Sequence, residues 1–372
     1  MTTRFAPLRH GVDAPRGRFI PEPGWSPRGA GRSLRRMSSP LETLGLPTLP
    51  ADLERVEQGL RDAVRHADPF LGEVAGHLVG AGGKRLRPAL TVCAAYAARG
   101  AGAASAEAIA GGCSVELVHL GSLYHDDVID EAETRRGVES VNSRWSNIVA
   151  ILAGDFLLAR ASEIAASLGA DVAALLAATI GELCRGQVLE LQNLFNREHE
   201  AEAYLSAIAG KTASLFATAC RIGGMVSEVD EPTLDALTSF GDHLGMCFQI
   251  VDDVLDLTQD TDTLGKPAGN DLVEGVYTLP VIAAMAQSPD LRARLGAAVD
   301  PSEVDAIRAL VRTDREWIPR ARGASLYIRP AMIATEEALG VRPSAEHLFF
   351  VITGPVGAYY ARGFEPVRIL VE

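Results

Sequence analysis

The stretch from Val118 to Asp130 reads VHLGSLYHDDVID, and a second stretch, from Phe248 to Thr258, reads FQIVDDVLDLT. Each runs from apolar residues into the pattern Asp-Asp-x-x-Asp. The apolar run before each motif is typical of an α-helix. On a helix, residues four apart share a face, so the first and last aspartates of each motif should point the same way. The two copies therefore predict a helical fold that carries two clusters of carboxylates.

These clusters favour a bound metal ion. They contribute six aspartates: Asp126, Asp127 and Asp130, and Asp252, Asp253 and Asp256. Three carboxylates in one helical turn repel one another and resist burial unless a cation is present. Hard oxygen ligands suit Mg²⁺, which bridges a few carboxylates to substrate phosphates. The pattern arises by chance roughly once in 4,000 positions, so two copies favour a metal–diphosphate site over two solvated acidic faces.

Composition limits the functions open to the chain. Its 372 residues suffice for one large or two ordinary domains, and 47% of them are hydrophobic. A net charge of −13 disfavours a general nucleic-acid-binding protein, so local basic groups must hold any anionic substrate. Five cysteines without a CxxC pair favour a reduced, cytoplasmic protein over a disulfide framework or a zinc site. Charged residues interrupt every long apolar run, so we expect at most peripheral contact with a membrane.

The sequence divides into three parts. Residues 1–36 hold eight arginines with several Gly and Pro, which is typical of a disordered leader. Residues 37–314 form the main domain, in which we expect about ten helices and no strand. Its breaks are expected near 81–83, 100–105, 137–143, 223–231 and 259–276. In residues 315–372 the runs HLFFVI (347–352) and PVRILV (366–371) predict short strands.

Basic residues accompany both acidic motifs. The segment Gly82-Gly83-Lys84-Arg85-Leu86-Arg87-Pro88 joins a flexible glycine pair to three cations that can clamp a diphosphate. Arg135 and Arg136 follow the first motif, and Lys266 follows the second. Lys211-Thr212 lies in AGKTASLF, which is not a P-loop because position 205, where that motif needs Gly, is Leu. This alternation of charge predicts a Mg²⁺–diphosphate–cation arrangement.

Four segments resemble one enzyme family in their order and spacing: GGKRLRP, VELVHLGSLYHDDVIDEAETRRG, GKTASLF and FQIVDDVLDLTQDTDTLGKPAGNDL. Through them, residues 37–314 are similar to all-trans polyprenyl diphosphate synthases of the actinobacterial long-chain type. The resemblance implies an all-α, isoprenoid-synthase-type helical bundle around a central cavity, with the two acidic motifs facing each other across its mouth. A short β-containing C-terminal appendage would follow the bundle.

The resemblance also implies roles for individual residues. The Mg²⁺ ligands would be Asp126, Asp130 and Asp252, supported by Asp127, Asp253 and Asp256. The diphosphate of isopentenyl diphosphate would be held by Lys84, Arg87, His119 and Arg136. The allylic diphosphate would be held by Arg135, Lys211 and Lys266, with Thr212 and Gln249 near the reacting carbons. On the residues alone, His119 stays open between core packing and diphosphate contact, and His125 is expected to be structural.

The implied reaction is the ionisation of an allylic diphosphate, followed by condensation with isopentenyl diphosphate and elimination of a proton. Mg²⁺ and the basic residues would neutralise the departing pyrophosphate, which can itself accept the proton. A homodimer is the implied assembly. Two alternatives stay open: a short-chain synthase that makes farnesyl or geranylgeranyl diphosphate, and an inactive or truncated partner subunit of a heteromeric synthase.

Two small residues before the first motif predict a long product. Gly121 and Ser122 lie five and four residues before Asp126 on the expected helix. In the resembled family a bulky aromatic side chain at this level acts as a floor that stops chain growth. Tyr124 is large but is expected to face away. The competing interpretation is that Gly121 only permits close helix packing.

The tail resembles a different family. Residues 315–372 are similar to an internal fragment of a branched-chain amino-acid aminotransferase, with Tyr327 and Arg329 at substrate-site positions. The lysine that would hold pyridoxal phosphate is missing from this fragment, so transamination is not expected. A synthase would continue past residue 314 with further helices, which the tail replaces. We therefore expect a bundle that lacks its last helices.

Overall fold

The computed structural model describes residues 46–99, 102–258, 269–287, 289–297, 325–334 and 347–356. Every helix and strand in these ranges belongs to the unit Pro47–Glu372. The first half of the bundle consists of helices α1 (Leu49–Ala63), α2 (Pro69–Gly80), α3 (Leu86–Arg99) and α4 (Ala106–Ile129). A small hairpin of β1 (Thr134–Arg135) and β2 (Val138–Glu139) and the short helix α5 (Val141–Arg144) follow.

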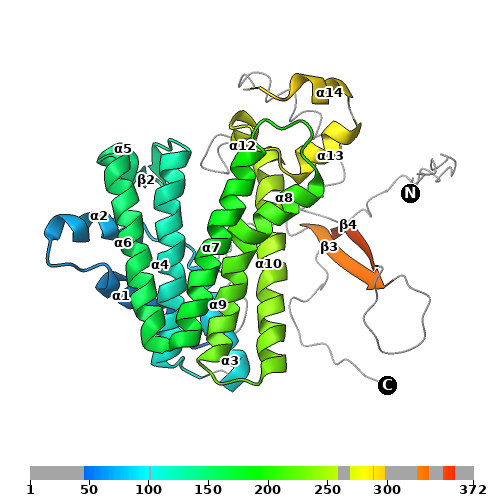
Figure 1. Cartoon of the computed structure of the whole chain (residues 1–372). Helices are drawn as coiled ribbons and strands as arrows, with labels where there is room; N and C mark the ends of the chain where they lie inside the picture. The colour runs from blue at the N-terminus through cyan, green and yellow to red at the C-terminus, as the bar shows by residue number, and fades with distance from the viewer. Residues whose placement is uncertain are drawn as a thin grey trace, which may run out of the picture. The chain divides into compact units, whose positions relative to one another are not determined.

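The second half begins with α6 (Asn147–Leu168), α7 (Ala170–Gln192) and α8 (Ala201–Ile208). The π-helix η2 (Ala209–Ala213), α9 (Ser214–Met225) and α10 (Glu231–Thr258) follow. Three short helices come next: α12 (Asn270–Val273), α13 (Leu279–Gln287) and α14 (Pro289–Arg294). In Figure 1 these short helices lie at one end of the bundle, beyond the ends of α7 and α10.

Helix α4 forms the centre of the bundle. It packs against α6, α3, α1 and α9, and fourteen of its residues are buried. The helix begins at Ser105, whose hydroxyl accepts a hydrogen bond from the amide of Ala108 and so satisfies one free donor of the first turn. Because α4 is apolar around most of its circumference, its aspartates at the C-terminal end emerge where the core ends.

Helix α7 approaches η2 and the end of α8 very closely. A Cβ atom on Gly186 would lie 2.7 Å from the carbonyl oxygen of Ala207, and one on Gly210 would lie 2.8 Å from that of Glu182. Only glycines allow the two backbones to come this near. The crossing therefore brings the end of α7 beside Lys211 and Thr212.

The predicted all-α class is confirmed, with two local corrections. The expectation of no strand in 37–314 was wrong, because the β1–β2 hairpin folds back after the first acidic motif, with Arg136 and Gly137 at positive φ in its turn. The expected breaks also omitted Gly169, which separates α6 from α7 at a φ of 124°.

The tail contains an antiparallel hairpin of β3 (Ser325–Ala334) and β4 (His347–Val356), in which Ser325 pairs with Val356. The strand predicted at 347–352 is thus confirmed, and β3 was not predicted. The strand predicted at 366–371 and the leader at 1–36 lie outside the described residues.

Candidate active site

The first aspartate motif lies at the C-terminal end of α4. Asp127 is fully buried, Asp126 is half-buried, and Asp130 is exposed as the residue that ends the helix. The pKa of Asp126 is raised to about 6, chiefly by burial and also by the nearby carboxylate of Asp130, while Lys211 opposes the shift. A cation beside this turn would therefore favour the charged form of Asp126.

Asp127 is fixed by the hairpin that follows it. The Nε of Arg135 donates to its Oδ1 at 2.6 Å, while its Oδ2 is buried without a hydrogen-bond partner among the described residues. Burial nevertheless raises the pKa of Asp127, with Arg135 opposing the shift. Arg135, which the resemblance assigns to the allylic diphosphate, is thus engaged with the first motif in this structure.

The second motif lies near the end of α10 and is divided in the same way. Asp252 is exposed, whereas Asp253 and Asp256 are 4% and 2% exposed. Burial raises the pKa of Asp253 to about 6, although hydrogen bonds from Tyr204 and Gln249 oppose the shift. In both motifs the residues expected to contact metal are the more accessible ones, and those expected to support them are buried. Asp252 and Asp256, which the helical spacing is expected to place on one face, differ in exposure, since Asp256 is buried and Asp252 is not.

A chain of hydrogen bonds joins the second motif to η2 and α8. The hydroxyl of Tyr204 donates to Asp253 Oδ2 at 2.5 Å, and Gln249 Nε2 donates to Asp253 Oδ1 at 2.8 Å. Thr212 Oγ1 in turn donates to Gln249 Oε1 at 2.7 Å. Thr212 is buried and its hydroxyl is engaged by Gln249. The position near the reacting carbons that the resemblance implies for both side chains stays a prediction.

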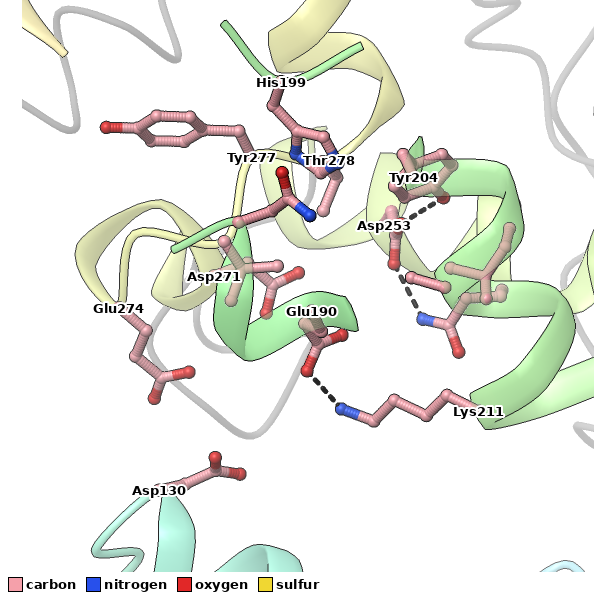
Figure 2. A pocket seen from close by; sticks show the side chains of 15 residues that line it. Asp130, Glu190, His199, Tyr204, Lys211, Asp253, Asp271, Glu274, Tyr277 and Thr278 are labelled. Atoms are coloured by element: carbon pink, nitrogen blue, oxygen red, sulfur yellow. Dashed lines mark hydrogen bonds and ion pairs between the residues drawn. The ribbon is translucent and has the colours of Figure 1, made fainter. Parts of the chain in front are cut away.

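Lys211 reaches the cavity between the two motifs (Figure 2). Its Nζ lies 2.5 Å from Glu190 Oε1 on α7. Burial alone would lower the pKa of Lys211, but the carboxylates of Glu190, Asp126 and Asp130 outweigh burial and raise it. The cavity encloses about 140 Å³, and Asp130, Gln249 and Asp253 also line it. Lys211 is therefore a fixed positive charge between the aspartate motifs.

A second basic group forms around the loop that precedes α3. The guanidinium of Arg87 lies 4.8 Å from the ring centroid of Phe216, and its Nε is buried without a partner among the described residues. Burial lowers the pKa of Arg87 to about 10. Arg136 donates to the carbonyl of Gly82 and so ties the β1–β2 turn to this loop. An orphaned buried donor of this kind fits an anionic ligand.

His119 is the neutral member of this group. Burial lowers its pKa well below the ordinary value, and the charges of Arg87 and Arg136 add to the effect. It can therefore offer a neutral imidazole to a diphosphate. Lys84 is exposed at the mouth of the loop, and Lys266 lies outside the described residues.

Arg85 is a structural residue within the same loop. It is 5% exposed and pairs with Glu57 at 2.5 Å and with Glu116 at 2.9 Å. Arg136 also lies 3.7 Å from Glu116. Of the three basic residues in this loop, Arg85 is paired with buried or half-buried glutamates, and Lys84 and Arg87 are available to a ligand.

The carboxylates do not form a preassembled metal cage. Among the described residues, no group of three His, Cys, Asp or Glu side chains is arranged to hold a metal ion. This fits Mg²⁺, which takes one or two carboxylates and completes its shell with water and substrate phosphates. The orphaned oxygen of Asp127 and the raised pKa of Asp126 likewise fit a nearby cation.

Comparison with known proteins agrees with this geometry. The family model described as polyprenyl synthetase matches residues 68–313. The chain is 42% identical over 254 residues to nonaprenyl diphosphate synthase of Mycobacterium tuberculosis, covering 67% of this chain and 75% of that protein. It is 41% identical to heptaprenyl diphosphate synthase component 2 of Geobacillus stearothermophilus, covering 72% and 83%.

The chain belongs to the polyprenyl synthetase family. It is an enzyme of the trans-prenyltransferase class. A solved decaprenyl diphosphate synthase from Rhodobacter capsulatus superposes with a TM-score of 0.68 at 34% identity, covering 74% of this chain and 86% of that one. A geranylgeranyl pyrophosphate synthase from Corynebacterium glutamicum superposes with a TM-score of 0.62 at 38% identity, covering 75% and 85%.

The residues expected to set product length in this synthase occupy different environments. Gly121 is buried against α6, where an added Cβ would lie 3.1 Å from the carbonyl oxygen of Gly154 and 3.2 Å from Leu158 Cγ. Ser122 is half-buried and donates to the carbonyl of His119. Close helix packing therefore accounts for Gly121, and Ser122 is the better candidate for a floor position. Tyr124 faces away as expected, donating to the carbonyl of Val74.

Four other residues have roles that the sequence did not suggest. Glu190 pairs with Lys211, Tyr204 holds Asp253, and Glu57 and Glu116 hold Arg85. Glu190 was detectable in principle, because it is an acidic residue on the largely apolar α7, four residues after Gly186. His125 is structural as predicted, since its Nε2 lies 3.2 Å from the carbonyl of Ile151.

Proposed function

We propose that this prenyltransferase condenses isopentenyl diphosphate with an allylic diphosphate to make a long-chain all-trans polyprenyl diphosphate. The observation that carries the proposal is the pairing of two aspartate motifs with two separate basic groups. One group is Lys211 beside Asp126, and the other is Arg87 with His119 and Arg136. Two diphosphate-bearing substrates need two such sites, whereas a hydrolase would need only one.

The residues divide the work between the two substrates. Lys211 places a positive charge beside the allylic diphosphate, and its attraction to the departing pyrophosphate strengthens as that group gains negative charge. Arg87, Arg136 and Lys84 hold isopentenyl diphosphate, with His119 as a neutral donor. Gln249 accepts from Thr212 and donates to Asp253, which holds its side chain beside the second motif, near where the reacting carbons would lie. The apolar helices around the site exclude water, which would otherwise quench a carbocation.

We propose Mg²⁺ as the cofactor, held by Asp126, Asp130 and Asp252 and supported by the buried aspartates of each motif. When bound, Mg²⁺ would act as a Lewis acid that polarises the allylic diphosphate. The accessible position of these three side chains supports the assignment.

A homodimer is the proposed assembly, through a surface formed by the start of α6 and the end of α7. Its exposed apolar side chains are Ile148, Ile151, Leu152, Val188 and Leu191. Although α7 is long and apolar enough to cross a membrane, only 22% of its apolar window is buried, and a second copy would cover this face. A partner subunit is the alternative occupant, suggested by the name of the heptaprenyl component 2 relative. Light scattering on the purified chain distinguishes a dimer from a monomer that awaits a partner.

The test of the main proposal is a product assay. Purified protein is incubated with farnesyl diphosphate, labelled isopentenyl diphosphate and Mg²⁺, and the products are separated by chain length. Products well beyond C20 are expected, and chelation of the metal should abolish them. Products that stop at C15 or C20 would favour a short-chain synthase, and no product would favour an inactive subunit. We also propose a cytoplasmic location with at most peripheral membrane contact, which fractionation of cells would test.

A further inference from the structure

Tyr204 lies behind the second aspartate motif, on another helix. It belongs to α8, is 4% exposed, and donates its hydroxyl to Asp253 Oδ2 at 2.5 Å (Figure 2). Gln249 occupies the other oxygen of the same carboxylate at 2.8 Å. Both oxygens of a buried aspartate are thus held by neutral donors, which fixes the plane of the carboxylate without neutralising its charge.

The π-helix contains Thr212 and follows the helix of Tyr204, and the two side chains reach neighbouring partners on α10, since Tyr204 donates to Asp253 and Thr212 to Gln249. In a regular α-helix Lys211, seven residues after Tyr204, would share its face. A π turn spaces its hydrogen bonds one residue further apart, so that Thr212 takes this face instead. Thr212 then donates to Gln249 Oε1, which leaves the Gln249 amide to donate to Asp253. Tyr204 therefore holds Asp253 directly and Thr212 holds it through Gln249, while Lys211 is directed to Glu190.

We propose that Tyr204 is a positioning residue of the prenyl-transfer site, an inference that rests on the proposed function. Its hydroxyl orients Asp253 so that this buried carboxylate adds negative charge behind Asp252, where the metal and the diphosphate would bind. Without the hydroxyl, Asp253 Oδ2 loses its donor in a buried environment. The carboxylate then turns toward other donors, and its charge no longer supports the metal bound by its neighbour.

Tyr204→Phe removes only this oxygen. Calorimetry of inorganic pyrophosphate binding in the presence of Mg²⁺ reads the metal–diphosphate site without requiring turnover. We expect binding to the variant to weaken about tenfold, as the loss of one hydrogen bond to a buried charged group implies. The Mg²⁺ concentration that gives half-maximal product formation should rise with it.

The chain contains a matched control. Tyr96 on α3 donates its hydroxyl to Asp52 Oδ2 at 2.5 Å, and Asp52 is 2% exposed. Tyr96→Phe therefore removes a buried tyrosine–aspartate hydrogen bond of the same length outside the aspartate motifs. Both variants should melt a few degrees below the wild type. Only Tyr204→Phe should weaken pyrophosphate binding.

The outcomes separate this inference from the proposed function. Equal pyrophosphate binding by wild type and Tyr204→Phe overturns the role of Tyr204 and leaves the function standing. Equal weakening in both tyrosine variants assigns the effect to stability and also overturns the role. A wild type that binds pyrophosphate with Mg²⁺ in a Tyr204-dependent way, yet forms no product, supports the inference and refutes the function. A wild type that binds no pyrophosphate refutes both.

Discussion

Replacement of Gly186 by alanine is expected to damage both stability and catalysis. The added Cβ would fall inside contact distance of the Lys211 amide nitrogen, 2.7 Å from the carbonyl oxygen of Ala207 and 2.8 Å from the carbonyl carbon of Gly210. These are backbone atoms, so no side-chain rotation can relieve the overlap. Helix α7 and the π-helix would have to separate by about 1 Å, and overpacking of this kind costs about 1–3 kcal/mol.

The better helix propensity of alanine offsets about 1 kcal/mol of this cost. The net loss should be up to about 2 kcal/mol, or up to roughly 8 °C in Tm for a domain of this size. Displacement of Lys211 from the cavity should reduce kcat/KM more than stability alone predicts, since a 1 Å misplacement can cost about a hundredfold. Thermal denaturation and the product assay measure the two effects.

Gly181→Ala is the matched control on the same helix. A Cβ at Gly181 meets nothing within 4 Å, so this variant should keep wild-type activity and gain up to about 1 kcal/mol of stability. A Gly186→Ala protein that melts as high as Gly181→Ala and retains full activity would refute the tight crossing of α7 with the π-helix.

Three further predictions address product length, pH and the basic loop. Ser122→Phe should shorten the longest product in the chromatographic assay. Gly121→Phe should mainly lower Tm, because its Cβ is forced toward α6. An unchanged product from Ser122→Phe would show that this position is not the floor that limits chain growth. The pKa of Asp126 is raised from 3.8 to about 6, so folding favours its protonated form, and this stabilisation is lost as pH rises through this window. Asp126→Asn cannot ionise, so in denaturant unfolding of metal-free protein its free energy of unfolding should rise by about 1–2 kcal/mol relative to that of wild type as the pH goes from 4 to 7, after discounting for solvent screening. A difference between the two proteins that does not change with pH would contradict the shift. Arg85→Met leaves the buried Glu116 with only the more distant Arg136, at 3.7 Å, and should cost up to about 3–5 kcal/mol in the same unfolding assay. A loss below about 1 kcal/mol would show that the Arg85–Glu116 pair is not needed.

The helices and the chemistry of the site were readable from the sequence because both depend on local spacing. Apolar residues at helical intervals predicted the bundle, and the breaks expected near 81–83 and 100–105 match the ends of α2 and α3. The β1–β2 hairpin was missed because its strands have two residues each. So short an element has too few positions to show a strand period.

Contacts between distant segments could not be read in this way. Arg85 and Arg87 are two residues apart in one basic loop, yet one is consumed by Glu57 and Glu116 and the other keeps a buried donor free of protein partners within the described residues. Which arginine is available depends on where α1 and α4 pack. The composition and spacing of the sequence do not show where these two helices pack.

The sequence by itself determined that two helices carry three aspartates each, with cations nearby, because the motif places carboxylates at helical intervals. The tertiary structure decided which of those aspartates are accessible and which are buried, since neighbouring elements cover Asp127, Asp253 and Asp256. It also joined Tyr204 to Asp253 directly and Thr212 to Asp253 through Gln249. The physical reason is the π-helix, whose wider turn rotates its side chains relative to those of α8. This turn packs against α7 and α10, so it depends on contacts between distant segments.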